Sequence, residues 1–172
     1  MISEIAFNDC HIPFENRLCE EGQGLSNLMS ILAEIRSMTA ALAIGLLRAA
    51  FDDSIRYANE RTAFGRTIGN FQLIQAKIAN MATDLEAAKL LTYKATHMVD
   101  NKIPCLKEAS MAKYFATEAA CKGTDEAMRI FGAYGYSMEY PVQRYYRDNR
   151  FLLNGGGTHE ILQANIARWV SQ

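Results

Sequence analysis

The chain has 172 residues and a formal net charge of −1; 49% of the residues are apolar and 22% are charged. This size and composition are typical of one globular domain with a substantial core, and the near-neutral charge gives no electrostatic basis for binding nucleic acid or an anionic membrane. The four cysteines form no CxxC pair and the three histidines lie far apart, which argues against a metal site and against a disulfide framework.

Residues 1–24 are predicted to be a remnant of a preceding β-domain and its exit turn. The stretch SEIAF, residues 3–7, alternates polar and apolar side chains as a strand does, and Pro13 then turns the chain. A single strand cannot pair its backbone groups, so we expect its sheet to lie outside this sequence.

Neither a leader nor a membrane span is expected. The N-terminus carries acids and lacks the long apolar core of a signal peptide. The longest apolar stretch, MTAALAIGLLRAAF, is broken by Arg48 and is too short to cross a bilayer. The expected location is the cytoplasm, or the mitochondrial matrix in a eukaryote.

Residues 25–172 are predicted to form a helical domain that begins with one very long helix. From Leu25 to about Arg61 the sequence has no proline and a single glycine, Gly45. The apolar residues of this stretch keep to helical spacings: Leu28, Leu32, Ile35, Leu42, Leu46, Phe51 and Ile55.

A second helix is expected after a break at Phe64-Gly65, with Asn70 as its candidate N-cap. Its apolar residues step alternately by three and four positions, which suits a nearly antiparallel neighbour at a shallow crossing angle. These residues are Phe71, Ile74, Ile78, Met81, Leu85 and Ala88.

A third helix is expected from about Cys105 to Phe131, opened by Pro104. One face of it carries small residues that would let a partner helix approach closely: Ala109, Ala112, Ala116, Ala119, Ala120 and Gly123.

The last part of the chain is predicted to hold a short packed helix over Tyr140–Asp148, with an ion pair between Arg147 and Asp148, and a final helix from about His159. The predicted fold is therefore all-α: an up-and-down four-helix bundle with long helices, preceded by the short remnant strand.

The turn between the first two helices, Glu60–Arg66, offers one candidate binding site. Arg61 could clamp a phosphate in bidentate fashion, and Phe64 could offer a flat face to a ring. The alternative is a surface arginine in a helix hairpin, with Phe64 plugging the end of that hairpin.

The glycine loop NGGGTHEIL, residues 154–162, offers a second candidate site. Successive N–H groups of Gly155, Gly156 and Gly157 ahead of a helix N-terminus can cradle an anion or a polarised carbonyl. The alternative is a tight loop capped by Thr158, with Glu160 favourably placed near the positive end of the helix.

Taken in order, these segments resemble the acyl-CoA dehydrogenase family. SEIAFNDCHIPFENRLCEEGQG is similar to the family's last β-domain strand, and ANERTAFGRTIGNFQ to its RxxFG…FQ motif. RIFGAYGYSMEYPVQRYYRD resembles the QxxGGxG and EYPVxRxxRD run, and GGGTHEI stands at the EGTxEI signature. The resemblance covers nearly the whole chain and implies the family's C-terminal helical-bundle domain.

The resemblance implies an FAD enzyme of fatty acid metabolism that oxidises the α,β bond of an acyl-CoA or acyl-carrier thioester. It also implies a homotetramer built as a dimer of dimers, with FAD bound between subunits, and an electron-transfer flavoprotein as partner of a dehydrogenase. Arg61, Phe64 and Gln72 would reach the FAD of a neighbouring subunit. The cofactor-binding positions implied by the motifs are Arg61, Phe64, Gln72, Arg129, Gly132, Thr158 and Glu160.

For the substrate, the resemblance places Arg36 on the CoA side of the pocket and the Gly156 N–H at the thioester carbonyl. The family's catalytic glutamate would stand at Gly156, or in some members at Ile35, and neither residue can accept a proton. Glu34 is the remaining candidate base, although one residue turns a helix by about 100°. Arg129 also replaces the motif glutamine, and Ala133 replaces its second glycine.

Four interpretations stay open from the sequence. The first is a dehydrogenase whose base is displaced or supplied by a partner. The second is a catalytically inactive structural subunit, the third is a flavin-dependent oxygenase or oxidase of the same family, and the fourth is a helical bundle used only for interaction. The domain by itself is expected to be inactive and to bind FAD weakly, because half of each FAD site would be missing.

Overall fold

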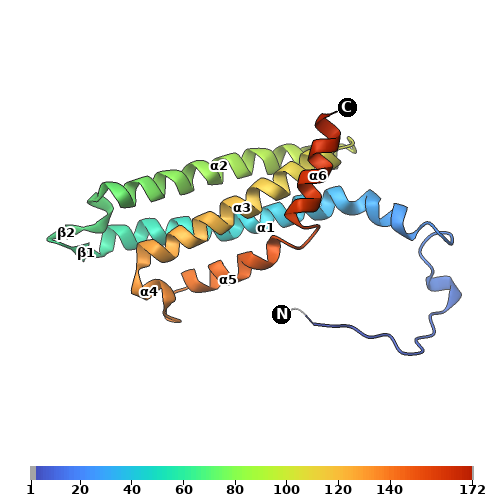
Figure 1. Ribbon diagram of the computed structural model, residues 1–172, viewed down its shortest axis with the longest axis horizontal. Helices are drawn as coiled ribbons and strands as arrows, with labels where there is room; N and C mark the ends of the chain where they lie inside the picture. The colour runs from blue at the N-terminus through green and yellow to red at the C-terminus, as the bar shows by residue number, and fades with distance from the viewer. Residues whose placement is uncertain (1–2, 172) are drawn as a thin grey trace. The chain divides into compact units, whose positions relative to one another are not determined.

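The computed structural model describes residues 3–171, and nearly all of their regular structure is helical, which confirms the all-α prediction (Figure 1). In chain order, the elements are η1 (Phe14–Asn16), α1 (Gly24–Glu60), β1 (Thr62–Ala63), β2 (Arg66–Thr67), η2 (Ile68–Asn70), α2 (Gln72–Asp100), α3 (Leu106–Phe131), α4 (Ala133–Tyr136), α5 (Val142–Leu152) and α6 (His159–Val170).

The chain divides into two compact units, one ending at Ile31 and the other beginning at Leu32, so the division falls within α1. The strand predicted over residues 3–7 of the first unit does not form. The prediction was wrong because no neighbouring strand offers these residues backbone partners. The strands of the described residues lie elsewhere, in the small hairpin after α1, where Thr62 pairs with Thr67 and Ala63 with Arg66.

In the second unit, α3 is the central helix and contacts α2, α4, α5 and α6. Figure 1 shows α5 running lengthwise beside α3, while α6 is steeply inclined to the long helices. The fourth helix of the bundle is therefore α5, and α6 closes one end.

The small-residue face predicted for α3 is confirmed, because its alanines are at most 5% exposed. Gly123 shows why the face must be small. A Cβ added to it would lie 2.2 Å from Cδ1 of Leu47 on α1, and Leu47 is itself fully buried. The absence of a side chain at Gly123 thus sets how closely α1 and α3 approach.

The core face of α1 differs from the apolar residues singled out in the sequence. Leu42 is 62% exposed, whereas Ala40, Ala43, Leu47 and Ala50 are fully buried. A helix with apolar residues on several sides offers more than one face to a partner. The small face of α3 packs against the face of α1 that is itself mostly small.

By length and composition alone, α1 could cross a membrane, and it is the one helix of residues 3–171 with this property. The same property is found in core helices of soluble proteins, so it is weak evidence for a span. Arg36, Ser37 and Ser54 are buried on this helix, which is consistent with packing inside the bundle.

Two local predictions were wrong in detail. Asn70 is not the N-cap of the second helix, because α2 is preceded by Phe71 and the Asn70 amide donates instead to Thr67 Oγ1 at 2.7 Å. The Tyr140–Asp148 stretch does form a helix, α5, but the described ion pairs include none between Arg147 and Asp148. Arg147 and Asp148 are consecutive in α5 and leave the helix about 100° apart, so the two side chains start in different directions.

The Gly123–Leu47 contact leads to a stability prediction with a matched control. Gly123→Ala and Gly45→Ala both gain about 1 kcal/mol of helix propensity, but only the first adds a methyl group to a filled space, since Gly45 has no atom within 4 Å of its added Cβ. We expect the Gly123→Ala variant to be about 1–3 kcal/mol less stable than the Gly45→Ala variant, measured by denaturant unfolding. Equal stabilities would contradict close packing at this point.

Candidate functional site

The glycine loop joins α5 to α6 and takes backbone conformations that require glycine. Gly156 has φ +75° and Gly157 has φ +112°, and both lie in the left-handed region that side chains disfavour. The expected cradle of three N–H groups is only partly present, because Gly155 N donates to Phe151 O and Gly157 N donates to Asn154 O, each at 3.2 Å. The Gly156 N–H donates to no described residue and is the one left for a ligand.

Behind the loop lie two buried cations. Arg36 of α1 donates from Nε to Gly156 O at 3.2 Å and from Nη1 to Ser110 Oγ at 2.9 Å. Lys113 of α3 donates from Nζ to Leu153 O and to Gly157 O, both at 2.8 Å. These bonds attach the loop to α1 and α3.

Burial governs the ionisation of both groups. Desolvation lowers the pKa of Arg36. It also lowers the pKa of Lys113 from 10.5 to about 8, with the neighbouring charge of Arg36 as the next cause. Burial removes water from a cation and so disfavours its charged form, and here no carboxylate of the described residues lies beside either group to oppose that effect.

The start of α6 is held on α3 by His159. Its Nδ1 lies 2.7 Å from Glu118 Oε1, and its Nε2 lies 2.8 Å from Thr117 Oγ1. Thr158 occupies the N-cap position, but its side chain makes no capping bond. The backbone of Glu160 and the Thr158 hydroxyl together lower the pKa of the exposed Glu160 carboxyl.

The two positions at which the resemblance implies a catalytic base are Gly156 and Ile35, and neither residue is a carboxylate. A Cβ on Gly156 would meet Thr39 Oγ1 at 3.5 Å, Ile35 Cγ2 at 3.6 Å and Arg36 Cγ at 3.9 Å. Ile35 therefore does line the glycine loop. Glu34 is exposed and is not among these nearest atoms, so its role as a base stays a prediction.

At the opposite end of the bundle, the β1–β2 hairpin and α4 lie near each other (Figure 1). Phe64 is 96% exposed at the tip of the hairpin and has φ +50°, so the expected plugging of the hairpin end does not occur. Its exposed ring instead lines a hollow of about 710 Å³ with Arg66, Phe71, Gln72 and Ile130.

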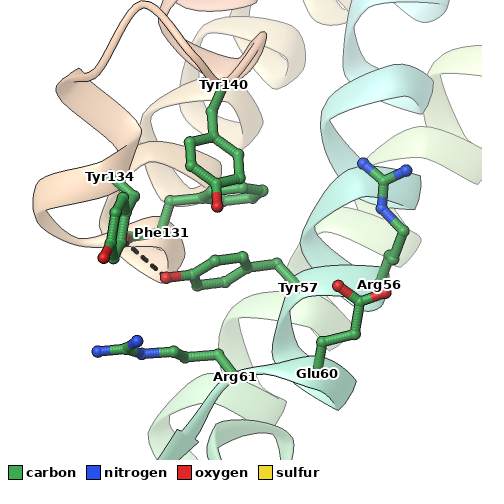
Figure 2. A pocket seen from close by; sticks show the side chains of 7 residues that line it. All are labelled: Arg56, Tyr57, Glu60, Arg61, Phe131, Tyr134 and Tyr140. Atoms are coloured by element: carbon green, nitrogen blue, oxygen red, sulfur yellow. Dashed lines mark hydrogen bonds between the residues drawn. The ribbon is translucent and has the colours of Figure 1, made fainter.

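Arg61 lies beside a second hollow, of about 410 Å³, between α1 and α4. Figure 2 shows four aromatic rings grouped there, with Tyr57 of α1 pointing toward Phe131. The Tyr57 and Phe131 rings stack at 4.1 Å, and the Arg61 guanidinium lies over the Tyr134 ring at 5.6 Å. The lining residues are Arg56, Tyr57, Glu60, Arg61, Phe131, Tyr134 and Tyr140.

Two predicted cofactor residues lie at the end of α3. Arg129 is paired with Asp125 at 2.7 Å, so its guanidinium already has a carboxylate. Gly132 has φ +59°, and nothing lies within 4 Å of an added Cβ, although its N–H donates to Arg129 O at 3.2 Å and its carbonyl accepts from Gly135 N at 3.0 Å. Gly135, by contrast, must be glycine for packing, because its Cβ would lie 2.5 Å from Met128 O.

The structure thus separates the predicted residues into two groups. Gly156, Ile35, Arg36, Thr158 and Glu160 gather at the glycine loop, while the remaining cofactor candidates gather near the hairpin. Sequence reasoning missed Lys113, whose signal was a lone charge within the alanine-rich face of α3.

Among residues 3–171, no cluster of His, Cys, Asp and Glu could hold a metal ion.

A family model described as acyl-CoA dehydrogenase, C-terminal domain, matches residues 22–171. The chain therefore belongs to the acyl-CoA dehydrogenase family, whose members are flavoproteins, and it corresponds to their C-terminal domain.

Several relatives support this assignment. Benzylmalonyl-CoA dehydrogenase of Aromatoleum aromaticum is 54% identical over 98% of this chain and 45% of its own length. The CarC subunit of the caffeyl-CoA reductase-Etf complex of Acetobacterium woodii is 46% identical over 96% of this chain and 44% of its own. The structure of butyryl-CoA dehydrogenase from Megasphaera elsdenii superposes with a TM-score of 0.93 at 38% identity, over 96% of this chain and 43% of that one. The chain spans less than half the length of these relatives.

Proposed function

We propose that this chain is the C-terminal domain of an enzyme that oxidises the α,β bond of an acyl-CoA thioester with FAD. The observation that carries the proposal is the glycine loop, where the free Gly156 N–H lies beside a buried arginine at the position of the family's reacting centre. The three proteins reported above are all named for CoA thioesters, which supports the same carrier here.

The hairpin end fits one part of FAD. A dinucleotide offers flat rings and a diphosphate. This end of the bundle offers the exposed Phe64 ring, the free space beside Gly132 and the Arg61 guanidinium, which is in no ion pair with a described acid. Arg61 would pair with the diphosphate, since a guanidinium matches phosphate oxygens in bidentate fashion.

The glycine loop would serve the thioester. FAD, when bound, supplies the acceptor for the hydride that leaves the β-carbon. The chain's own contribution is to hold the thioester carbonyl at the Gly156 N–H and to stabilise negative charge on that oxygen, because a fixed N–H donor acts most strongly where charge develops.

The separation of the two groups of residues supports an assembly of several copies. The β1–β2 hairpin, which follows Arg61, and the start of α6, which follows Thr158, lie toward opposite ends of the bundle (Figure 1). The two ends would therefore serve different FAD molecules, and a dimer of dimers would complete each site. An electron-transfer flavoprotein is the proposed electron acceptor, since the CarC relative is named as part of an Etf complex.

Arg61→Ala tests the FAD assignment. In the whole protein that carries this chain, the variant is expected to bind FAD about 10- to 100-fold more weakly, because a charge-assisted hydrogen bond contributes about 1.5–3 kcal/mol. FAD retention during dialysis and fluorescence titration measure this affinity. Arg48→Ala, which removes an exposed arginine paired with Asp52 on α1, is the control, and an equal loss in both variants would refute a role of Arg61 at FAD.

A further inference from the structure

The two cations behind the glycine loop are almost completely buried and carry no compensating charge. Arg36 is 2% exposed and Lys113 is 0% exposed. Neither makes an ion pair with any acid among the described residues. Their hydrogen bonds go to a hydroxyl and to backbone carbonyls, which are neutral.

The nearest acids lie toward solvent. Glu160 is exposed, and the Thr158 hydroxyl helps to lower the pKa of its carboxyl; Glu118 is paired with His159. Both act on Lys113 only as minor opposing charges. The interior behind the loop therefore carries an excess of positive charge.

Two buried cations without an acid beside them lower the stability of the fold unless an anion binds next to them. An isolated buried charge is strongly unfavourable, and a partner of opposite sign offsets the cost. Arg36 also keeps a donor in reserve, because Nη2 bonds to no described residue and lies 3.6 Å from the Cβ position of Gly157. The site is thus built to receive a negatively charged group beside the glycine loop.

The same place lacks a proton acceptor. The side chains that face the Cβ position of Gly156 belong to Ile35, Arg36 and Thr39, and none of them can remove a proton from carbon near neutral pH. A plain acyl thioester would bring neither the missing anion nor a way to form an enolate here.

We propose that the acyl thioester taken by this site carries a carboxylate on its α-carbon, and that Arg36 binds this carboxylate. Loss of CO2 then takes the place of proton removal. The inference rests on the proposed function and names its substrate class, a 2-carboxyacyl thioester.

The reaction balances without a base. The bond between the α-carbon and the carboxylate breaks, CO2 leaves, and the electron pair stays on the α-carbon as the enolate of the thioester. One β-hydrogen leaves as hydride to the flavin, which is the oxidant, and the α,β double bond forms. The products are CO2, the α,β-unsaturated thioester and reduced flavin, and no proton is transferred. The negative charge moves only from the carboxylate to the thioester oxygen, near the Gly156 N–H and the two cations.

Ligand affinity tests whether the site recognises the α-carboxylate, independently of the oxidation step. Malonyl-CoA carries the α-carboxylate but has no β-carbon to oxidise, and acetyl-CoA lacks both groups. In the whole protein, calorimetry is expected to show that Arg36→Gln weakens malonyl-CoA binding about 30-fold or more and changes acetyl-CoA binding less than about threefold. Equal weakening of both ligands, or no change in either, would overturn the proposal.

Two further variants guard against a folding artefact. Arg36→Lys keeps the charge with fewer donors and is expected to lie between the native protein and Arg36→Gln in malonyl-CoA affinity. Arg48→Gln removes an exposed arginine of the same helix and is expected to leave both affinities unchanged. Thermal unfolding of each variant shows whether it is folded.

Turnover separates this inference from the proposed function. Ethylmalonyl-CoA and butyryl-CoA differ only in the α-carboxylate. We expect ethylmalonyl-CoA to bleach the flavin with release of one CO2 per flavin, and butyryl-CoA neither to bleach it nor to exchange its α-proton in D2O. Bleaching by butyryl-CoA without ethylmalonyl-CoA turnover would overturn the inference and leave the proposed function standing. An FAD-loaded protein that no member of either the 2-carboxyacyl or the acyl series can reduce would overturn both.

Discussion

Gly156→Glu is expected to make the whole protein oxidise plain acyl-CoA thioesters, with a gain of about 100-fold or more over the native protein. A carboxylate at this position would supply the missing proton acceptor, and a positioned base contributes about 10²–10⁴-fold. The local structure accepts the first atom of the side chain, since its Cβ would make ordinary contacts with Thr39 and Ile35 at 3.5 and 3.6 Å. The φ of +75° costs a residue other than glycine about 1–2 kcal/mol, so the variant should be less stable and still folded. Flavin bleaching by butyryl-CoA and α-proton exchange in D2O are the measurements.

Gly156→Gln is the matched control for this gain. Glutamine has the same size and meets the same backbone strain, but it cannot accept the proton. The glutamine variant is expected to stay inactive toward butyryl-CoA, so equal activity of the two variants would show that the carboxylate is irrelevant. With ethylmalonyl-CoA we expect the glutamate variant to be less active than the glutamine variant, because a carboxylate at position 156 would repel the carboxylate of the substrate.

The long helices could be predicted from the sequence because each has a strong local signal. The alternating steps of three and four from Phe71 to Ala88 and the alanine-rich face of α3 are both packed as expected, with Met81, Leu85 and Ala88 at most 2% exposed. The buried face of α1 could not be predicted in the same way. Its choice depends on which neighbour packs closest, and that is a property of the tertiary structure.

Only part of the candidate site could be predicted from the sequence. Glycine spacing identified the loop, and the absent carboxylate at Gly156 could be read directly from the motif. The bonds that hold the loop could not be predicted from the sequence, because Arg36 lies 120 positions from Gly156 and Lys113 lies 44 positions from Gly157. The lone strand failed for a related reason, since strand pairing depends on partners that local alternation does not specify.

Lys113 is expected to make the folded chain more stable as pH rises from 7 to 10. The pKa of this group is about 8 in the folded state against an ordinary 10.5. Below pH 8 both states carry the proton, and the folded state bears the full cost of the buried charge. Between pH 8 and 10.5 the unfolded state binds more protons, so the free energy of unfolding increases with pH. The pKa difference corresponds to about 3 kcal/mol, most of it gained by pH 10.

Other groups change stability in the opposite direction over this range. Burial raises the pKa values of Cys105, Cys121, Tyr57 and Tyr145, so these groups lower stability as the unfolded state loses their protons first. The contribution of Lys113 is therefore measured as the difference between the native chain and Lys113→Met in denaturant unfolding at pH 7 and pH 10. The native chain should gain about 2–3 kcal/mol relative to the variant. Parallel pH curves would show that this amine keeps its proton.

The neutral amine of Lys113 would still hold the glycine loop, because it retains two N–H donors for the carbonyls of Leu153 and Gly157. Its charge, however, would be gone. Above pH 8 the fold should therefore gain stability from this group while the affinity for malonyl-CoA falls, since one of the two cations that attract the carboxylate is lost. If affinity and stability instead rose together with pH, Lys113 would have no electrostatic role in binding the ligand.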